Sequence, residues 1–242
     1  MLTGLARFRD SLSSTTRWTL LAGFTILAVV VTMLAPRMAQ PNSYHQFADP
    51  RSMMGVPNAL NVLSNIPFLI VGLWGLWWMA RPESVQHFCD PLERWPACAI
   101  FLGLLTTGAG SAYYHLAPNN HTLAFDRLGM IVGFMPIVPL AIAERVSARW
   151  GMWLLAPMIM LGAGTVLLWN HSELAGAGDL RWYLLVQAYA FLATAGILLF
   201  TRPRYDHQSL WLAAIGCYGL AKVVEIADKS IYSLTGQMVS GH

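Results

Sequence analysis

The stretch Gly108–Met130, GAGSAYYHLAPNNHTLAFDRLGM, joins two apolar runs that are each long enough to cross a bilayer. It places Ser111, His115 and Asp126 where the first run ends and the second begins. A polar or ionisable group at membrane depth costs roughly 2.5–3.5 kcal/mol on insertion scales, so such groups commonly serve a function. On a helix, Ser111 and His115 lie one turn apart, about 6 Å along the axis. We therefore expect a hydrolytic or metal-dependent site at this junction.

The composition is that of an integral membrane protein. Of the 242 residues, 56% are hydrophobic and only 11% are charged, whereas soluble domains carry about 25% charged residues. Lipid favours helices, because they satisfy their own backbone hydrogen bonds. The sequence predicts a single domain, 1–242, that is an all-α bundle of about seven transmembrane helices. The apolar runs are Trp18–Ala35, Leu60–Ala80, Pro96–Leu116, Phe125–Ala143, Trp150–Trp169, Trp182–Thr201 and Ser209–Ala227.

Charge and cysteine content exclude other classes. The net charge of +3 comes from dispersed basic residues, so no nucleic-acid partner is expected. The cysteines Cys89, Cys98 and Cys217 form neither a disulfide framework nor a CxxC metal pair. The remaining histidines, such as His45 and His121, fall in or beside loops, where solvated side chains are the default.

The distribution of Lys and Arg predicts the orientation. With the N-terminus in the cytoplasm, nine basic residues flank the inner ends of the spans and five flank the outer ends, as the positive-inside rule requires. The first run, within residues 1–40, is interpreted as an uncleaved anchor span rather than a signal sequence. The inner residues are Arg7, Arg9, Arg17, Arg81, Arg94, Arg145, Arg149, Arg202 and Arg204.

This orientation places every polar group of interest toward the outer leaflet. Ser111 and His115 end an outward span, and Asp126 opens the next one. The second and seventh spans bring further polar residues to the same level, and we expect these to line a pocket. They are Asn58, Asn61, Asn65, Lys222, Glu225 and Asp228. The last three lie at three-residue steps on one predicted helix face, where an internal ion-pair ladder is an equally good interpretation.

These residues resemble the alkaline ceramidase family, part of a superfamily of seven-span membrane hydrolases that includes the progestin and adiponectin receptors. In that family Ser-x-x-x-His ends one span, an Asp begins the next and His-x-x-x-His opens the last. SAYYH (Ser111–His115) and FDRLGM (Phe125–Met130) match the first two elements. NALNVLSN (Asn58–Asn65) is similar to the start of the first core span.

The resemblance covers residues 55–242 and implies that the first run is an extra span ahead of six of seven core spans. The sequence ends VSGH, and His242 takes the place of the first histidine of His-x-x-x-His. The second histidine and the final span are therefore expected to be missing. The acidic cluster of the calcium site in animal alkaline ceramidases has no counterpart either, so calcium is not expected.

The resemblance implies a zinc-dependent hydrolase that cleaves the amide bond of ceramide or a similar membrane lipid. Zinc would be held by His115 and His242, two of the three expected histidines. Asp126 would act as general base, and Ser111 would donate a hydrogen bond to the oxyanion.

Two alternatives remain. A non-catalytic seven-span receptor or transporter would use the same polar groups structurally, and an incomplete set of metal ligands favours it. A retinal protein would use Lys222 as Schiff-base amine, but the lysine lies too near the outer end of its span.

Overall fold

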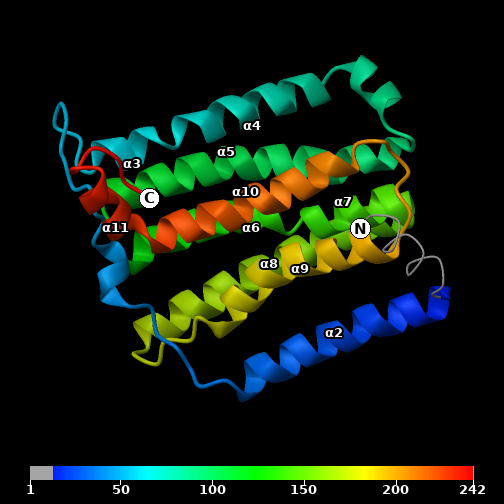
Figure 1. The fold of residues 1–242 in the computed structure, drawn as a ribbon, viewed down its shortest axis with the longest axis horizontal. Coiled ribbons are helices and arrows are strands. Elements are labelled where there is room, and N and C mark those ends of the chain that lie inside the picture. The colour runs from blue at the N-terminus through cyan, green and yellow to red at the C-terminus, as the bar shows by residue number, and fades with distance from the viewer. Residues whose placement is uncertain (1–12, 242) are drawn as a thin grey trace.

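The structure is a computed structural model that describes residues 13–241, and within that range it contains helices and no strands (Figure 1). Seven segments are long and apolar enough to span a membrane. The predicted all-α membrane bundle is thereby confirmed. The helices are α2 (Ser14–Leu34), α3 (Ala59–Leu63), α4 (Ile66–Met79), α5 (Arg94–Leu116), α6 (Asn120–Phe134), α7 (Ile137–Arg145), α8 (Ala148–Leu174), α9 (Arg181–Phe200), α10 (Gln208–Ile226) and α11 (Asp228–Leu234), with short 3-10 turns η1 (Asn42–His45), η2 (Pro82–His87) and η3 (Pro91–Glu93).

Two of the spans are broken helices. The second is formed by α3 and α4, which meet at Ser64 and Asn65. The fourth is formed by α6 and α7, which meet at Met135 and Pro136. Pro136 has no backbone N–H to donate to the preceding turn of the helix, which accounts for the second break.

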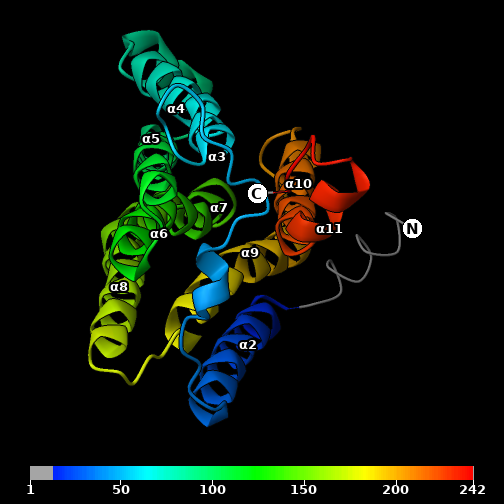
Figure 2. The same ribbon diagram turned by 90° about the vertical axis from the view of Figure 1, so that its left-hand side faces the viewer.

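The close pair α5 and α6 forms the centre of the bundle, with α4 on one side and α8 on the other (Figure 2). Helix α9 packs on α7, and α2 packs on α9 at the edge of the molecule. Thr25 Oγ1 and Tyr189 OH are 2.9 Å apart across the α2–α9 contact. The anchor span is thus peripheral to the helices that carry the candidate site.

Helix α10 contacts the bundle through a few aromatic side chains. Near its start, Trp211 Nε1 donates to Glu144 of α7 at 2.8 Å. Tyr218 stacks on Phe191 of α9 with ring centroids 3.6 Å apart. No residue of α10 is buried.

One end of the bundle is closed by the segment that connects α2 to α3, which we call the capping segment (residues 36–58). It crosses from the start of α9 to α11 at the left of Figure 1. Backbone bonds join Leu180 N to Met38 O at 2.8 Å and Ala59 N to Arg51 O at 3.0 Å. The end that this segment covers is called the capped end below.

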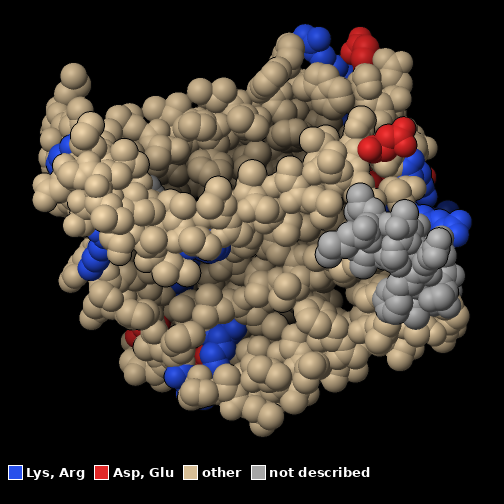
Figure 3. Space-filling view, viewed as in Figure 1, with Lys and Arg blue, Asp and Glu red and all other residues tan. Residues whose placement is uncertain are grey.

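The charge distribution fits a membrane protein. In Figure 3 few Lys, Arg, Asp and Glu side chains are visible, many of them toward the two ends of the long axis, and most of the surface between the ends belongs to other residues.

Candidate functional site at the capped end

The close approach of Ser111 and Asp126 is the centre of the candidate site. Ser111 of α5 lies near the Asp126 carboxyl group across the α5–α6 interface. Asp126 is 7% exposed, so it lies inside the bundle. The sequence placed both residues at one junction, and the structure brings the two helices together there.

Local sequence explains how these two helices come close enough. A capping box at Asn119 and Thr122 fixes the first residue of α6, and with it the register of Asp126. A Cβ atom on Gly110 would lie 2.5 Å from the Phe125 carbonyl oxygen, and one on Gly129 would lie 2.6 Å from the Thr106 carbonyl oxygen. The absence of side chains at both glycines therefore permits backbone contact on either side of Asp126.

His115 lies in the last turn of α5 and is 5% exposed. Its ring packs against Phe47 of the capping segment, with centroids 4.7 Å apart. Its carbonyl oxygen accepts from Asn58 Nδ2 at 2.9 Å. Asn58 holds this position with φ of 47°, a left-handed conformation that asparagine adopts more readily than most residues. The capping segment thus fixes the end of α5 on which His115 lies.

Asn61 and Asn65 are buried, and their recorded bonds hold the broken span together. Asn61 Nδ2 donates to Asp49 O at 3.2 Å, and Asn65 Nδ2 donates to Asn61 O at 2.9 Å. The Asn65 amide thus bonds within the α3–α4 break, and the Asn61 amide joins α3 to the capping segment.

Lys222 and Glu225 form an ion pair on α10, with Nζ and Oε2 2.7 Å apart. Tyr44 of the capping segment donates to Glu225 Oε1 at 3.3 Å. Burial, together with the nearby charges of Glu225 and Asp126, raises the pKa of Tyr44 above its usual value, so its hydroxyl remains a donor. Asp126 lies within electrostatic range of both Lys222 and Glu225. This pair therefore borders the site from the side of α10.

Asp228 differs from the expectation. Helix α10 ends at Ile226 and Asp228 begins α11, so the three charges do not continue along one helix face. The Asp228 carboxylate accepts from Ala48 N at 3.0 Å, from Ser240 Oγ at 2.7 Å and from Gly241 N at 2.8 Å. Because these donors come from two segments distant in the chain, Asp228 joins the capping segment and residues 240–241 to α11.

A cavity of about 360 Å³ opens between the capping segment and the ends of α10 and α11. Tyr44, Phe47 and Glu225 line it. Because these side chains also border Asp126 or His115, the cavity adjoins the candidate site.

The contacts of Arg127, the residue after Asp126, were not expected from the sequence. Arg127 forms no ion pair with Asp126 in residues 13–241. Its Nη2 is instead 2.5 Å from Gln40 Oε1, and its guanidinium lies over the rings of Trp169 and Tyr183, at 3.9 and 4.6 Å from their centroids. Gln40 N in turn donates to Glu173 at 2.6 Å. This network anchors the capping segment to α6 and α8.

His45 was expected to be solvated, and this was wrong. Its Nδ1 is 2.9 Å from Tyr114 OH, and its Nε2 is 2.9 Å from Asn120 Oδ1. Both ring nitrogens are engaged because the capping segment folds back over the α5–α6 junction. His121 is exposed, as expected.

The expected zinc ligands are His115 and His242, and His242 lies outside the described residues. Among residues 13–241 no group of three or more His, Cys, Asp or Glu is arranged to hold a metal ion. The described part of the chain thus supplies one of the expected ligands, His115.

Comparison with family models, with curated proteins and with solved structures finds no match for this chain. The site must therefore be interpreted from its own chemistry.

Proposed function

We propose that the capped end is the active site of a membrane-embedded hydrolase that cleaves the amide bond of ceramide or a similar lipid. The observation that carries the proposal is the buried Asp126 carboxyl group, which lies near Ser111, with His115 one helical turn further along α5. A buried carboxylate suits general base catalysis. The resemblance of SAYYH and FDRLGM to the alkaline ceramidases supports the same reaction.

In this mechanism a water oxygen attacks the amide carbonyl carbon while Asp126 accepts the water proton. The C–N bond then breaks, and the same proton passes from Asp126 to the leaving amine. Ser111 lies near Asp126, and its hydroxyl would donate a hydrogen bond to the oxyanion that forms on the carbonyl oxygen.

If the enzyme uses zinc, His115 and His242 would be the residues that hold it. Bound there, it would supply Lewis-acid polarisation of the water and the carbonyl group. The roles of Asp126 and Ser111 follow from their own contacts.

A lipid substrate suits a site inside a membrane bundle, because its acyl chains can stay in the bilayer while the amide reaches the capped end. With the N-terminus in the cytoplasm, as the positive-inside rule favours, the capped end faces the outer leaflet.

The test is turnover by the purified protein in lipid nanodiscs, with ceramide carrying a labelled acyl chain. We expect release of labelled fatty acid and an equal amount of sphingoid base, and no cleavage of a diacylglycerol of matched chain length. Saturable ceramide binding without release would contradict hydrolysis and favour a receptor or transporter.

A further inference from the structure

Three buried polar atoms beside the candidate site have no hydrogen-bond partner among residues 13–241: Arg127 Nη1, Tyr183 OH and Gln187 Nε2. Their residues are only 4%, 3% and 7% exposed, respectively. A buried donor without an acceptor is costly, and folded proteins leave few of them. An acceptor group that the described chain does not supply therefore fits here.

The three donors form one group. Tyr183 and Gln187 lie one turn apart on the same side of α9. The Arg127 guanidinium lies over the Tyr183 ring, 4.6 Å from its centroid, and so brings α6 to the same place. Because Arg127 Nη2 is already bonded to Gln40, Nη1 is the terminal nitrogen left for a ligand.

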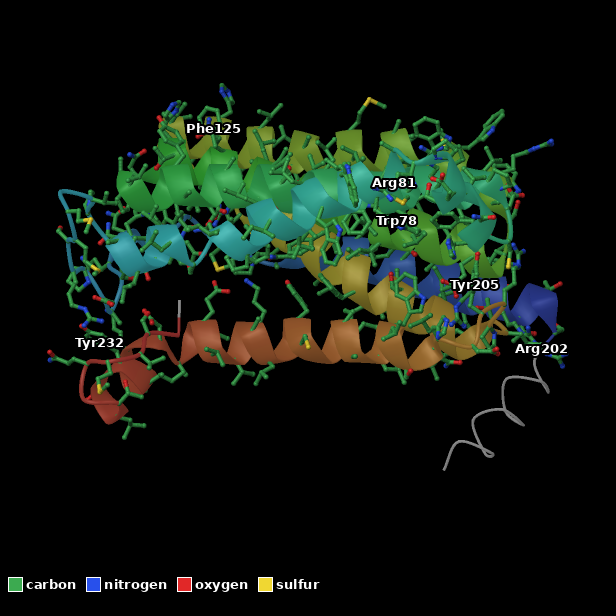
Figure 4. All side chains as sticks on the ribbon, turned by 90° about the horizontal axis from the view of Figure 1, so that it is seen from above. Trp78, Arg81, Phe125, Arg202, Tyr205 and Tyr232 are labelled. Atoms are coloured by element: carbon green, nitrogen blue, oxygen red, sulfur yellow. The ribbon has the colours of Figure 1, made fainter. Side chains whose placement is uncertain are left out.

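This group borders the proposed active site. Tyr183 lies within electrostatic range of Asp126, Tyr44 and Tyr218, which belong to α6, the capping segment and α10. Tyr44 also lines the cavity of about 360 Å³ at the capped end. Figure 4 shows α10 along one side of the bundle, with Tyr232 marking the capped end, and no residue of α10 is buried. The donors thus lie next to a residue of the cavity wall, on a side of the bundle that α10 covers loosely.

We propose that Arg127, Tyr183 and Gln187 bind the hydroxyl oxygens of the lipid, so that the substrate class of this site is hydroxylated lipid amides. Guanidinium, phenol and amide groups all donate to a hydroxyl oxygen, and the sphingoid base of ceramide carries hydroxyl groups close to its amide. A site built to hydrogen-bond such a group rejects an analogue that lacks it, because its buried donors then stay unpaired. The identity of the substrate rests on the proposed function, whereas the donor group follows from its own contacts.

The test compares ceramide with an N-acyl alkylamine of matched chain length that has no hydroxyl groups, on the purified full-length protein in lipid nanodiscs. The apparent Kd and kcat/KM are measured for both lipids. We expect Tyr183→Phe and Gln187→Met each to weaken ceramide binding and to lower kcat/KM for ceramide by about tenfold or more, and to leave both quantities unchanged for the alkylamine. Arg127 is kept, because its bond to Gln40 anchors the capping segment.

The thermal midpoint without ceramide gives a second readout. Each variant removes a buried donor that has no partner in the described chain, so the midpoint should not fall. The matched control is Tyr189→Phe, also on α9, whose hydroxyl is 2.9 Å from Thr25 Oγ1 of α2. This variant should lower the midpoint and leave the binding of both lipids unchanged.

Equal losses for the two lipids, unchanged ceramide binding in both variants, or a lowered midpoint in both would overturn the donor site. Selective ceramide binding that these variants abolish, without any turnover by the wild type, would support the donor site and contradict the hydrolase. Turnover that neither variant changes would do the reverse.

Discussion

At the scale of single residues, Asp126 and its neighbour Ser111 determine what the site can do. An isolated charge inside the bundle would be costly, and the nearby Ser111 hydroxyl offsets part of that cost for the Asp126 carboxylate.

Replacing the Ser111 hydroxyl in Ser111→Ala should lower the stability of the protein, because the buried Asp126 carboxyl group loses a polar neighbour. Ceramide hydrolysis should also fall, because the oxyanion loses its donor. The control is Ser84→Ala, whose buried hydroxyl donates to the Arg81 carbonyl at 2.8 Å, away from the site. Thermal unfolding and initial rates check both effects, and an unchanged rate in Ser111→Ala would remove the serine from the mechanism.

Asp49 gives a prediction about pH. Arg51 donates to its carboxylate through Nε and Nη2, each at 2.7 Å, and these bonds hold the Asp49 pKa below its usual range. A carboxyl group whose pKa is lower in the folded state than in the unfolded state stabilises the fold at pH values above the unfolded-state pKa, which is about 3.9 for Asp. This stabilisation is lost as the pH falls through the folded-state pKa. The thermal midpoints of wild type and Asp49→Asn should therefore differ at pH 7 and converge in acid below about pH 4. A constant difference across that range would show that Asp49 acts through packing alone.

At the scale of helices, the α5–α6 contact positions the site, and glycines permit that contact. In Gly110→Ala, the new Cβ would lie 2.5 Å from the Phe125 carbonyl oxygen. Because backbone atoms cannot move aside easily, we expect this overpacking to destabilise the protein by about 1–3 kcal/mol. Activity should fall with it, since separating the helices breaks the contact between Ser111 and Asp126.

Gly164→Ala is the matched control, because no atom lies within 4 Å of a Cβ at that position of α8. Alanine is favoured over glycine in helices by about 1 kcal/mol, so this variant should be as stable as wild type or more so. Thermal unfolding and turnover are measured for both variants. If they behave alike, the close approach of α5 and α6 is not what positions the site.

The positions of the membrane spans could be predicted from the sequence, because each span needs an apolar run long enough to cross a bilayer. The sequence also placed Ser111 and Asp126 together, since a short loop joins their helices. The capping segment was not predictable: it has no periodic pattern, and its contacts, such as Gln40 with Arg127 and Asp49 with Asn61, join residues distant in the chain. The turn that separates α10 from α11 was not predictable either. The Asp228 carboxylate accepts hydrogen bonds from Ala48 in the capping segment and from residues 240–241, and nothing in the local sequence indicates these partners.

At the scale of the whole molecule, the two ends have different chemistry. One end is capped by residues 36–58 over the acid and histidine of the proposed active site, and at the other end Arg17, Arg145 and Arg202 line a cavity. The orientation we propose puts the capped end outside the cell, and labelling can test it.

Cys89 is exposed near the end opposite the capped end, and Ser43 is exposed in the capping segment. In intact cells a membrane-impermeant maleimide should label Ser43→Cys and leave Cys89 unlabelled until the membrane is opened. Labelling is measured on the purified protein, with a Cys89→Ser background to assign each signal. The reverse pattern would place the capped end in the cytoplasm.

The measurement that tests the central claim most directly is the initial rate of ceramide hydrolysis by Asp126→Asn in nanodiscs. Asparagine keeps the shape of the side chain but cannot accept the water proton. The rate should fall by about 10²–10⁴-fold, while the control Asp179→Asn, at the same end but paired with Arg181 at 2.7 Å, keeps the wild-type rate. Wild-type turnover by Asp126→Asn, with the protein folded and bound to ceramide, would contradict the account.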